Sequence, residues 1–205
     1  MKLNQIEKAL MNNRVRAFVQ RRYEAALMER LGGRMEGCRV LEIGCGRGVG
    51  TEIIFNRFGA REVHAFDIDP DMVEQARWRL SRFPAERLRL FVGDAEAIEA
   101  EGASYDAVFD FGIIHHVPDW RRAVSEVARV LRPGGRFFFE EVTSQALNRW
   151  SYRTFLDHPR QNRFSAEELV AELERQGILV GRNSVEWLFG DFVTGVGHRV
   201  AKGSE

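Results

Sequence analysis

The chain has 205 residues, 44% of them hydrophobic and 29% charged, which is the composition of an ordinary globular protein. Lysine plus arginine and aspartate plus glutamate both count 30, so the formal net charge is zero. This balance provides no general attraction to nucleic acid or to an anionic membrane, and we expect neither as a partner. We find no apolar run long enough for a membrane span and no signal-peptide pattern, and therefore expect a cytoplasmic protein.

The N-terminal part is predicted to be helical over residues 3–31, with a break near Asn12-Asn13 and a stop at Gly32-Gly33. This helical segment precedes the first predicted strand and does not take part in the alternation of strands and helices that follows. We therefore divide the chain into an N-terminal helical cap, residues 1–37, and a main domain, residues 38–205.

Short apolar strands alternate with helices through the main domain. The predicted strands cover residues 39–43, 62–66, 88–92, 105–109, 137–139, 178–188 and 192–200. Strands that alternate with helices predict a Rossmann-like, α/β fold, with a seven-stranded, mostly parallel sheet and helices on both faces. The last two strands, close together in the sequence, predict a C-terminal antiparallel hairpin.

Capping signals mark where several helices begin. Asp69 suits an N-cap and Pro70 the first helical position, where its missing N–H costs nothing. Pro118-Asp119 precedes another helix, which we expect to end at Pro133-Gly134-Gly135. Ser165-Ala166-Glu167-Glu168 has the spacing of a capping box and predicts a third helix start.

A glycine-rich loop, Glu42-Ile43-Gly44-Cys45-Gly46-Arg47-Gly48, follows the first predicted strand. Its glycines allow a sharp turn and a close approach of the backbone to a ligand. The dinucleotide fingerprint G-x-G-x-x-G would need a third glycine at position 49 or 51, where the chain has Val49 and Thr51. Glu42 would oppose a pyrophosphate but suits an ammonium group, so the loop argues against NAD.

Acidic residues follow the next two strands. Asp67 ends the second strand, where a carboxylate accepts hydrogen bonds from both hydroxyls of a ribose. A helix cap is the alternative role, but Asp69 fills it better. Asp94 ends the third strand, within Gly93-Asp94-Ala95, where it would accept from the adenine amino group. Ligands of such sheets bind at this edge, where the strand order reverses.

Taken together, residues 38–140 resemble the class I S-adenosylmethionine (SAM)-dependent methyltransferases, and are especially similar to the ubiquinone/menaquinone-biosynthesis type. The resemblance is carried by the glycine loop with the preceding Val40-Leu41, by Phe66-Asp67-Ile68-Asp69-Pro70-Asp71-Met72, by Gly93-Asp94-Ala95, by Tyr105-Asp106-Ala107-Val108-Phe109 and by Val130-Leu131-Arg132-Pro133-Gly134-Gly135. It implies SAM as cofactor, S-adenosyl-L-homocysteine as product, and in-line methyl transfer to a small-molecule acceptor.

The resemblance also assigns the cofactor-binding residues. The methionyl part of SAM would lie on Gly44, Cys45 and Gly46, with Glu42 near its amino group. Asp67 would bind the ribose, and Ile68, Asp94 and Ala95 would contact the adenine. Asp110 and Phe111 would lie beside the methionine moiety.

His115 and His116 follow the fourth strand, where the family often places acceptor-facing residues. Histidine titrates near neutral pH, so either is a candidate catalytic base; the alternative is local packing. The two are adjacent and no carboxylate completes a metal-ligand set, so we expect no metal site. The nucleic-acid amine motif Asn-Pro-Pro-Tyr is absent after this strand, which again argues against a nucleic acid acceptor.

Residues 141–164 are too long for a simple connection, and long insertions are often functional. We predict an acceptor-site lid here, with Trp150, Tyr152 and Arg153 as substrate residues and an aromatic or anionic small molecule as acceptor; a plain extension of the core is the alternative. Two other functions remain open, a non-catalytic SAM-binding partner or sensor and a nicotinamide-dependent oxidoreductase. The oligomeric state is not predicted.

Overall fold

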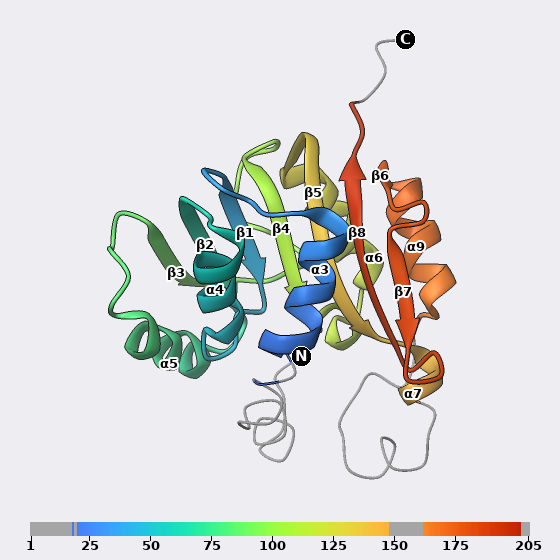
Figure 1. Ribbon diagram of the computed structural model, residues 1–205, viewed down its shortest axis with the longest axis horizontal. Coiled ribbons are helices and arrows are strands. Elements are labelled where there is room, and N and C mark those ends of the chain that lie inside the picture. The colour runs from blue at the N-terminus through green and yellow to red at the C-terminus, as the bar shows by residue number, and fades with distance from the viewer. Residues whose placement is uncertain (1–17, 19, 148–161, 202–205) are drawn as a thin grey trace.

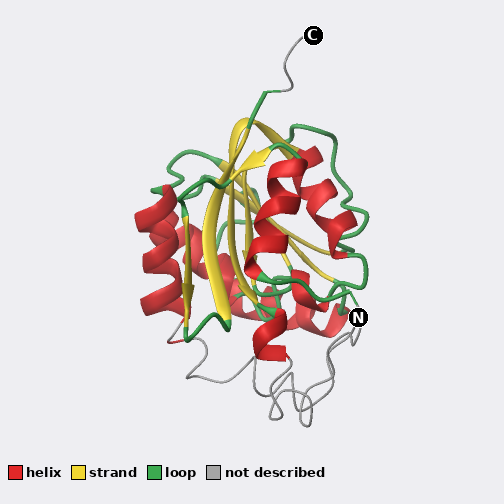
Figure 2. Cartoon of the chain, turned by 90° about the vertical axis from the view of Figure 1, so that its right-hand side faces the viewer, coloured by secondary structure: helices red, strands yellow, loops and turns green. Residues whose placement is uncertain are grey.

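The computed structural model describes residue 18 and residues 20–147 and 162–201. In this part of the chain a central sheet lies between two layers of helices (Figure 1 and Figure 2). The predicted break at Asn12-Asn13, the candidate substrate residues Trp150, Tyr152 and Arg153, and the middle of the predicted lid lie outside the described residues.

Within the described residues, eight strands form one sheet in the order β3-β2-β1-β4-β5-β8-β6, with β7 also paired to β8. Their bounds are β1 Arg39–Ile43, β2 Glu62–Asp67, β3 Leu88–Val92, β4 Tyr105–Phe111, β5 Leu131–Val142, β6 Ile178–Leu179, β7 Ser184–Trp187 and β8 Phe192–Arg199. Strands β1 to β5 run parallel to one another. Strand β8 pairs antiparallel with β5, β6 and β7. The predicted α/β fold class and the C-terminal hairpin are therefore confirmed.

The count of seven strands was one too low, because the stretch 178–188 does not form one strand. It divides into β6 and β7 around Gly181, whose backbone is left-handed (φ +56°) and interrupts the ladder. The strand β5 also begins earlier than predicted. It starts at Leu131, directly after the preceding helix, and includes the Pro133-Gly134-Gly135 stretch that we expected to lie between helix and strand.

The described helical segments are η1 Gln20–Glu24, α3 Ala25–Gly32, α4 Val49–Ile53, η2 Ile54–Phe58, α5 Pro70–Leu80, η3 Ile114–His116, α6 Trp120–Val130, α7 Ser144–Leu147 and α9 Ala166–Arg175. The predicted caps are confirmed. The side chain of Asp69 accepts from the backbone N–H of Asp71, and that of Asp119 from Arg122. Ser165 and Glu168 form both hydrogen bonds of a capping box.

The two faces of the sheet bury separate hydrophobic clusters. Successive side chains of a strand point to opposite faces, so Phe137 and Phe139 pack with α6 and α9, whereas Phe138 stacks on Phe109 at a ring distance of 4.3 Å on the other face. Burying side chains of this size contributes about 1.5–3 kcal/mol each. Helix α3, which belongs to the predicted N-terminal cap, packs in the second cluster through fully buried Ala25 and Met28. The division into a cap and a main domain remains a prediction.

The carboxyl ends of the parallel strands meet at one edge of the sheet, the lower edge in Figure 1. Strand β1 lies between β2 and β4, so the chain leaves β1 toward one side of the sheet and later returns to its other side. This is the point where the strand order reverses and where ligands of such sheets bind. The glycine loop and the residues after β2, β3 and β4 all lie at this edge.

Candidate functional site

The glycine loop is held against the neighbouring strand tips. The backbone N–H of Cys45 donates to the carbonyl of Phe66 on β2, with an N···O distance of 2.8 Å. Gly44 and Gly46 both have left-handed backbones, with φ of +67° and +49°. A Cβ on Gly44 would lie 2.3 Å from the side chain of Ile113, whereas a Cβ on Gly46 would meet no atom within 4 Å. The loop is therefore packed at Gly44 and open at Gly46.

Asp67 ties this loop to the start of the following helix. One carboxylate oxygen accepts from the backbone N–H of Gly46 at 2.9 Å and the other from that of Asp69 at 2.9 Å. The cap of α5 is made by Asp69 itself, so Asp67 does not serve as the helix cap. Asp67 is half-buried beside the open side of the loop, and its role as a ribose-binding carboxylate remains a prediction.

The tip of β3 continues this edge. Strand register places Asp67 beside Val92, and the N–H of Gly93 donates to the carbonyl of Asp67 at 3.1 Å. Asp94 is exposed and accepts from the N–H of Glu96, and Ala95 is buried. Ile68, predicted to pack on adenine, is 40% exposed although it is a large apolar side chain. The predicted adenine-binding residues therefore share one edge with Asp67.

Glu42, at the end of β1, is a buried carboxyl group beside the start of α4. It is 1% exposed and accepts a short hydrogen bond from the hydroxyl of Thr51. Burial raises the pKa of the Glu42 carboxyl to about 8; the Thr51 hydrogen bond opposes the rise, and the charges of Asp67 and Asp110 add to it. Its predicted contact with the cofactor amino group remains a prediction.

Asp110 and Phe111 end β4 and are both buried. The Asp110 carboxylate accepts from the backbone N–H groups of Gly112 and Ile113, at 3.0 and 2.9 Å, and so holds the turn after the strand. Burial, followed by the charge of Glu141, raises its pKa well above the usual range. Phe111 packs on Phe109 in the core. Their place beside the methionine moiety of SAM remains a prediction.

His115 and His116 lie in the short helix η3, both buried, with ring centroids 4.1 Å apart. The Nδ1 atom of His115 lies 2.5 Å from Oε2 of Glu141, a fully buried residue near the end of β5. Burial raises the pKa of Glu141 to about 7; a hydrogen bond from Asp110 lowers it, and the charge of Glu140 raises it.

Sequence reasoning missed Glu140 and Glu141 as parts of the site, since residue 141 marked the start of the predicted lid. Two consecutive carboxylates directly after the apolar run Phe137-Phe138-Phe139 were the available signal. The two ends of the predicted lid are part of the folded domain: Glu141 belongs to β5, and Phe164 is buried against Trp120 at a ring distance of 4.9 Å. A lid role for the segment remains a prediction.

Among residues 18, 20–147 and 162–201, no group of three or more His, Cys, Asp or Glu side chains is placed to hold a metal ion. No helix of this described part has both the length and the apolar composition needed to cross a membrane. Burial raises the pKa of the Cys45 thiol well above its usual value, and its Sγ atom interacts with the carbonyl of Gly46.

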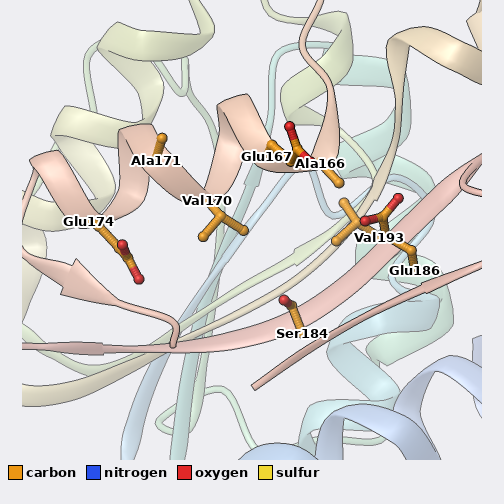
Figure 3. Close-up of a pocket in the computed structure, with 8 residues that line it drawn as sticks. All are labelled: Ala166, Glu167, Val170, Ala171, Glu174, Ser184, Glu186 and Val193. Carbon is orange, nitrogen blue, oxygen red and sulfur yellow. The ribbon is translucent and has the colours of Figure 1, made fainter. Parts of the chain in front are cut away.

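A groove of about 340 Å³ lies between α9 and the β7–β8 hairpin (Figure 3). Its apolar floor includes Val170 and Val193, and Glu167, Glu174 and Glu186 stand around it. None of the predicted cofactor residues lines this groove, so it is separate from the edge that carries the glycine loop.

The fold and the site together define a class of protein: a Rossmann-like domain with a glycine loop and carboxylates at the tips of adjacent strands. Comparison with known proteins identifies the family. Residues 40–135 match the family described as "Methyltransferase domain". Residues 40–135 therefore form a methyltransferase domain, and the predicted resemblance to the class I SAM-dependent methyltransferases and the predicted cofactor, SAM, are confirmed.

Individual relatives agree with this assignment. The chain is 35% identical, over 78% of its length and 59% of the relative's, to a Mycolicibacterium smegmatis protein described as a probable SAM-dependent methyltransferase. It is 32% identical to the fatty-acid O-methyltransferase of the same organism, over 62% of this chain and 45% of the relative. The chain thus spans about half the length of these relatives. A SAM-dependent methyltransferase from Aquifex aeolicus has the same fold, with a TM-score of 0.75 and 20% identity over 98% of this chain and all of that one.

Proposed function

We propose that this protein transfers a methyl group from SAM to a small-molecule acceptor by in-line displacement. The main observation behind the proposal is the composition of one sheet edge. There, an open glycine loop and the half-buried Asp67 lie beside three buried carboxyl groups, those of Glu42, Asp110 and Glu141. SAM supplies a methyl group on a positively charged sulfonium, and the protein supplies position and environment.

The charges at this edge fit such a cofactor. Neighbouring carboxyls raise the pKa of two of these groups: Asp67 and Asp110 raise that of Glu42, and Glu141 raises that of Asp110. Like charges disfavour ionisation, and a nearby cation favours it. A ligand that carries a sulfonium and an ammonium group would therefore relieve the repulsion. In this arrangement Glu42 would act electrostatically from its buried position, while Gly44, Cys45, Gly46 and Asp67 would hold the cofactor.

The acceptor is proposed to be a small anionic or aromatic molecule. The formal net charge of zero gives no general affinity for nucleic acid. A relative with 32% identity is named as a fatty-acid O-methyltransferase, and a fatty acid is a small anionic acceptor. His115, buried near the end of β4, is the proposed acceptor of a proton from an O–H or N–H group of that molecule.

Two measurements test this function. Calorimetry with SAM, S-adenosylhomocysteine and NAD should show binding of the first two and none of NAD; binding of NAD in their place would contradict the proposal. Incubation with methyl-labelled SAM and a fractionated metabolite extract should give a labelled small molecule. SAM binding without a labelled product in any fraction would instead favour a non-catalytic SAM-binding protein, and label in nucleic acid would contradict the acceptor class.

A pair of glycine variants tests where the cofactor lies. Both Gly44→Ala and Gly46→Ala place a side chain on a left-handed backbone, but only the first meets a neighbour, Ile113, at 2.3 Å. Overpacking costs about 1–3 kcal/mol, so Gly44→Ala should melt at a lower temperature than Gly46→Ala. Each kcal/mol lowers the melting temperature of a domain of this size by about 2–4 °C. Gly46→Ala should lose affinity for SAM by about tenfold or more, a loss of about 1.4 kcal/mol, because its methyl group enters the open side of the loop.

Thermal unfolding of both variants gives their melting temperatures, and calorimetry gives their affinities for SAM. Gly37→Ala is the control, since it has the same left-handed backbone (φ +74°) and open space but lies away from the predicted site, before β1. If folded Gly46→Ala and Gly37→Ala bind SAM equally well, the loop is not the cofactor cradle.

A further inference from the structure

The carboxylate of Glu141 makes three hydrogen bonds with the segment after β4. Oε1 accepts from the backbone N–H of Ile114 at 2.6 Å, and Oε2 accepts from the backbone N–H of His115 at 3.2 Å. Oε2 also lies 2.5 Å from Nδ1 of the His115 ring. The side chains of both residues are almost fully buried, 0% and 3% exposed. Glu141 thus holds both the backbone and the ring of His115.

These contacts determine which ring nitrogen carries the proton. A neutral imidazole has one donor nitrogen and one acceptor nitrogen. Both oxygens of Glu141 already accept backbone N–H groups, which favours the ionised carboxylate. The group facing Oε2 is therefore Nδ1–H, and Nε2 is the acceptor nitrogen of the neutral ring.

Asp110 completes the arrangement from the neighbouring strand. Its Oδ1 accepts from Gly112 and Ile113, and its carboxyl shares a hydrogen bond with Glu141. Two neighbouring buried carboxyls do not both ionise. Glu141 receives N–H groups on both of its oxygens, whereas Asp110 receives them on Oδ1 alone, so Asp110 is the one that keeps its proton. Asp110 then donates to Glu141, which remains charged and faces the histidine. The tips of β4 and β5 together fix the ring.

We propose that Glu141 is a positioning residue that holds His115 as the Nδ1–H tautomer, with Nε2 as the proton acceptor, and that Asp110 supports Glu141 by donating a hydrogen bond. This rests on the proposed function for its role in turnover: a proton leaves an O–H or N–H of the acceptor and binds Nε2. The resulting imidazolium faces the Glu141 carboxylate, which stabilises its charge. His116 and Glu140 are the other titratable neighbours of this pair.

The tautomer is measured directly by two-bond ¹H–¹⁵N correlation spectra of ¹⁵N-histidine-labelled protein at pH 8, with His115→Gln used to assign the signals. Wild-type protein should show His115 with a protonated Nδ1 and an unprotonated Nε2. Glu141→Gln should lose this preference and show a large Nε2–H population. Wild-type His115 in the Nε2–H form, or an unchanged tautomer in folded Glu141→Gln, would overturn the proposal.

Two matched variants separate this role from a general structural one. Asp110→Asn should keep the Nδ1–H tautomer, because an amide both accepts from Gly112 and Ile113 and donates to Glu141; loss of the tautomer would contradict Asp110 as donor. Glu140→Gln, next to Glu141 on the same strand, should also keep it. A shift in Glu140→Gln as large as in Glu141→Gln would show that any buried charge change alters the ring, and would contradict the assignment to Glu141.

Turnover gives the second readout, once a labelled product is in hand. His115→Gln and Glu141→Gln should both slow label transfer by about 10²–10⁴-fold, the usual contribution of general base catalysis, while His115→Gln binds SAM within about twofold of wild type. Full turnover in folded Glu141→Gln would overturn the positioning role. Should no product form with the wild type, the proposed methyl transfer fails, whereas the tautomer result still decides the geometry of His115.

Discussion

Replacing Asp67 with alanine should weaken SAM binding about 10- to 150-fold, or about 1.5–3 kcal/mol, the value of hydrogen bonds to a charged group. The expected reason is the loss of a ribose-binding carboxylate at the tip of β2. The structure adds a second contribution, because Asp67 also accepts from the N–H groups of Gly46 and Asp69 and so shapes the glycine loop. Isothermal calorimetry with SAM gives the affinity, and thermal unfolding without ligand reports any loss of loop order.

Two further variants distinguish these contributions. Asp67→Asn keeps the size of the side chain and one carbonyl acceptor, so its affinity should fall between wild type and Asp67→Ala. Asp71→Ala removes an exposed carboxylate from the first turn of α5, four residues away, and should bind SAM as the wild type does. An affinity for SAM within twofold of wild type in Asp67→Ala would show that the ribose site has been assigned to the wrong residue.

Replacing Glu42 with glutamine should stabilise the unliganded protein at alkaline pH and weaken its binding of SAM. The Glu42 pKa is about 8 in the folded protein and near its ordinary value of 4.5 in the unfolded chain. The folded state therefore binds this proton more tightly, and the stability that results is present at acidic pH and is lost as the pH rises from about 4.5 to 8. Glutamine is neutral throughout this range, still accepts from Thr51, and avoids the loss.

Thermal unfolding at pH 5, 6.5 and 8 should therefore show the melting temperature of Glu42→Gln rising relative to wild type as pH increases. The gain should reach several degrees at pH 8, since 1 kcal/mol shifts the melting temperature of a domain of this size by about 2–4 °C. At pH 8 saturating SAM should raise the melting temperature of wild type more than that of the variant, because the cation favours an ionised Glu42. If the melting temperatures of the two proteins change equally with pH, Glu42 does not have a raised pKa in the folded protein.

Glu52, in the helix that follows the glycine loop, serves as a control because its pKa is lowered where that of Glu42 is raised. Burial would raise its pKa, but hydrogen bonds and charges from Arg82 and Arg21 outweigh that effect and lower it. A lowered pKa stabilises the fold above the ordinary pKa and loses that stabilisation as the pH falls. Glu52→Gln should accordingly be less stable than wild type at pH 8 and approach it at acidic pH, whereas Glu42→Gln shows the reverse trend.

Local signals predicted most of the fold. The N-cap at Asp69, the capping box at Ser165 and the alternation of apolar strands with helices each depend on residues a few positions apart, and all are present in the structure. The division of residues 178–188 into two strands was not predictable in this way. The break at Gly181 depends on which residues of β8 pair with each segment. This pairing joins parts of the chain that are distant in the sequence.

For the site, the family, the cofactor class and the placement of the glycine loop, Asp67 and Asp94 at one edge could be predicted from the sequence, because these motifs follow strand ends and strand ends of a parallel sheet share one edge. The surroundings of each carboxyl could not be predicted, because they depend on how the strands pair and pack. Glu42 is buried beside the start of α4, and Asp110 and Glu141 meet across β4 and β5 to hold His115. Burial and the proximity of residues 110 and 141 arise from strand pairing over long sequence separations, and these set the pKa of each group.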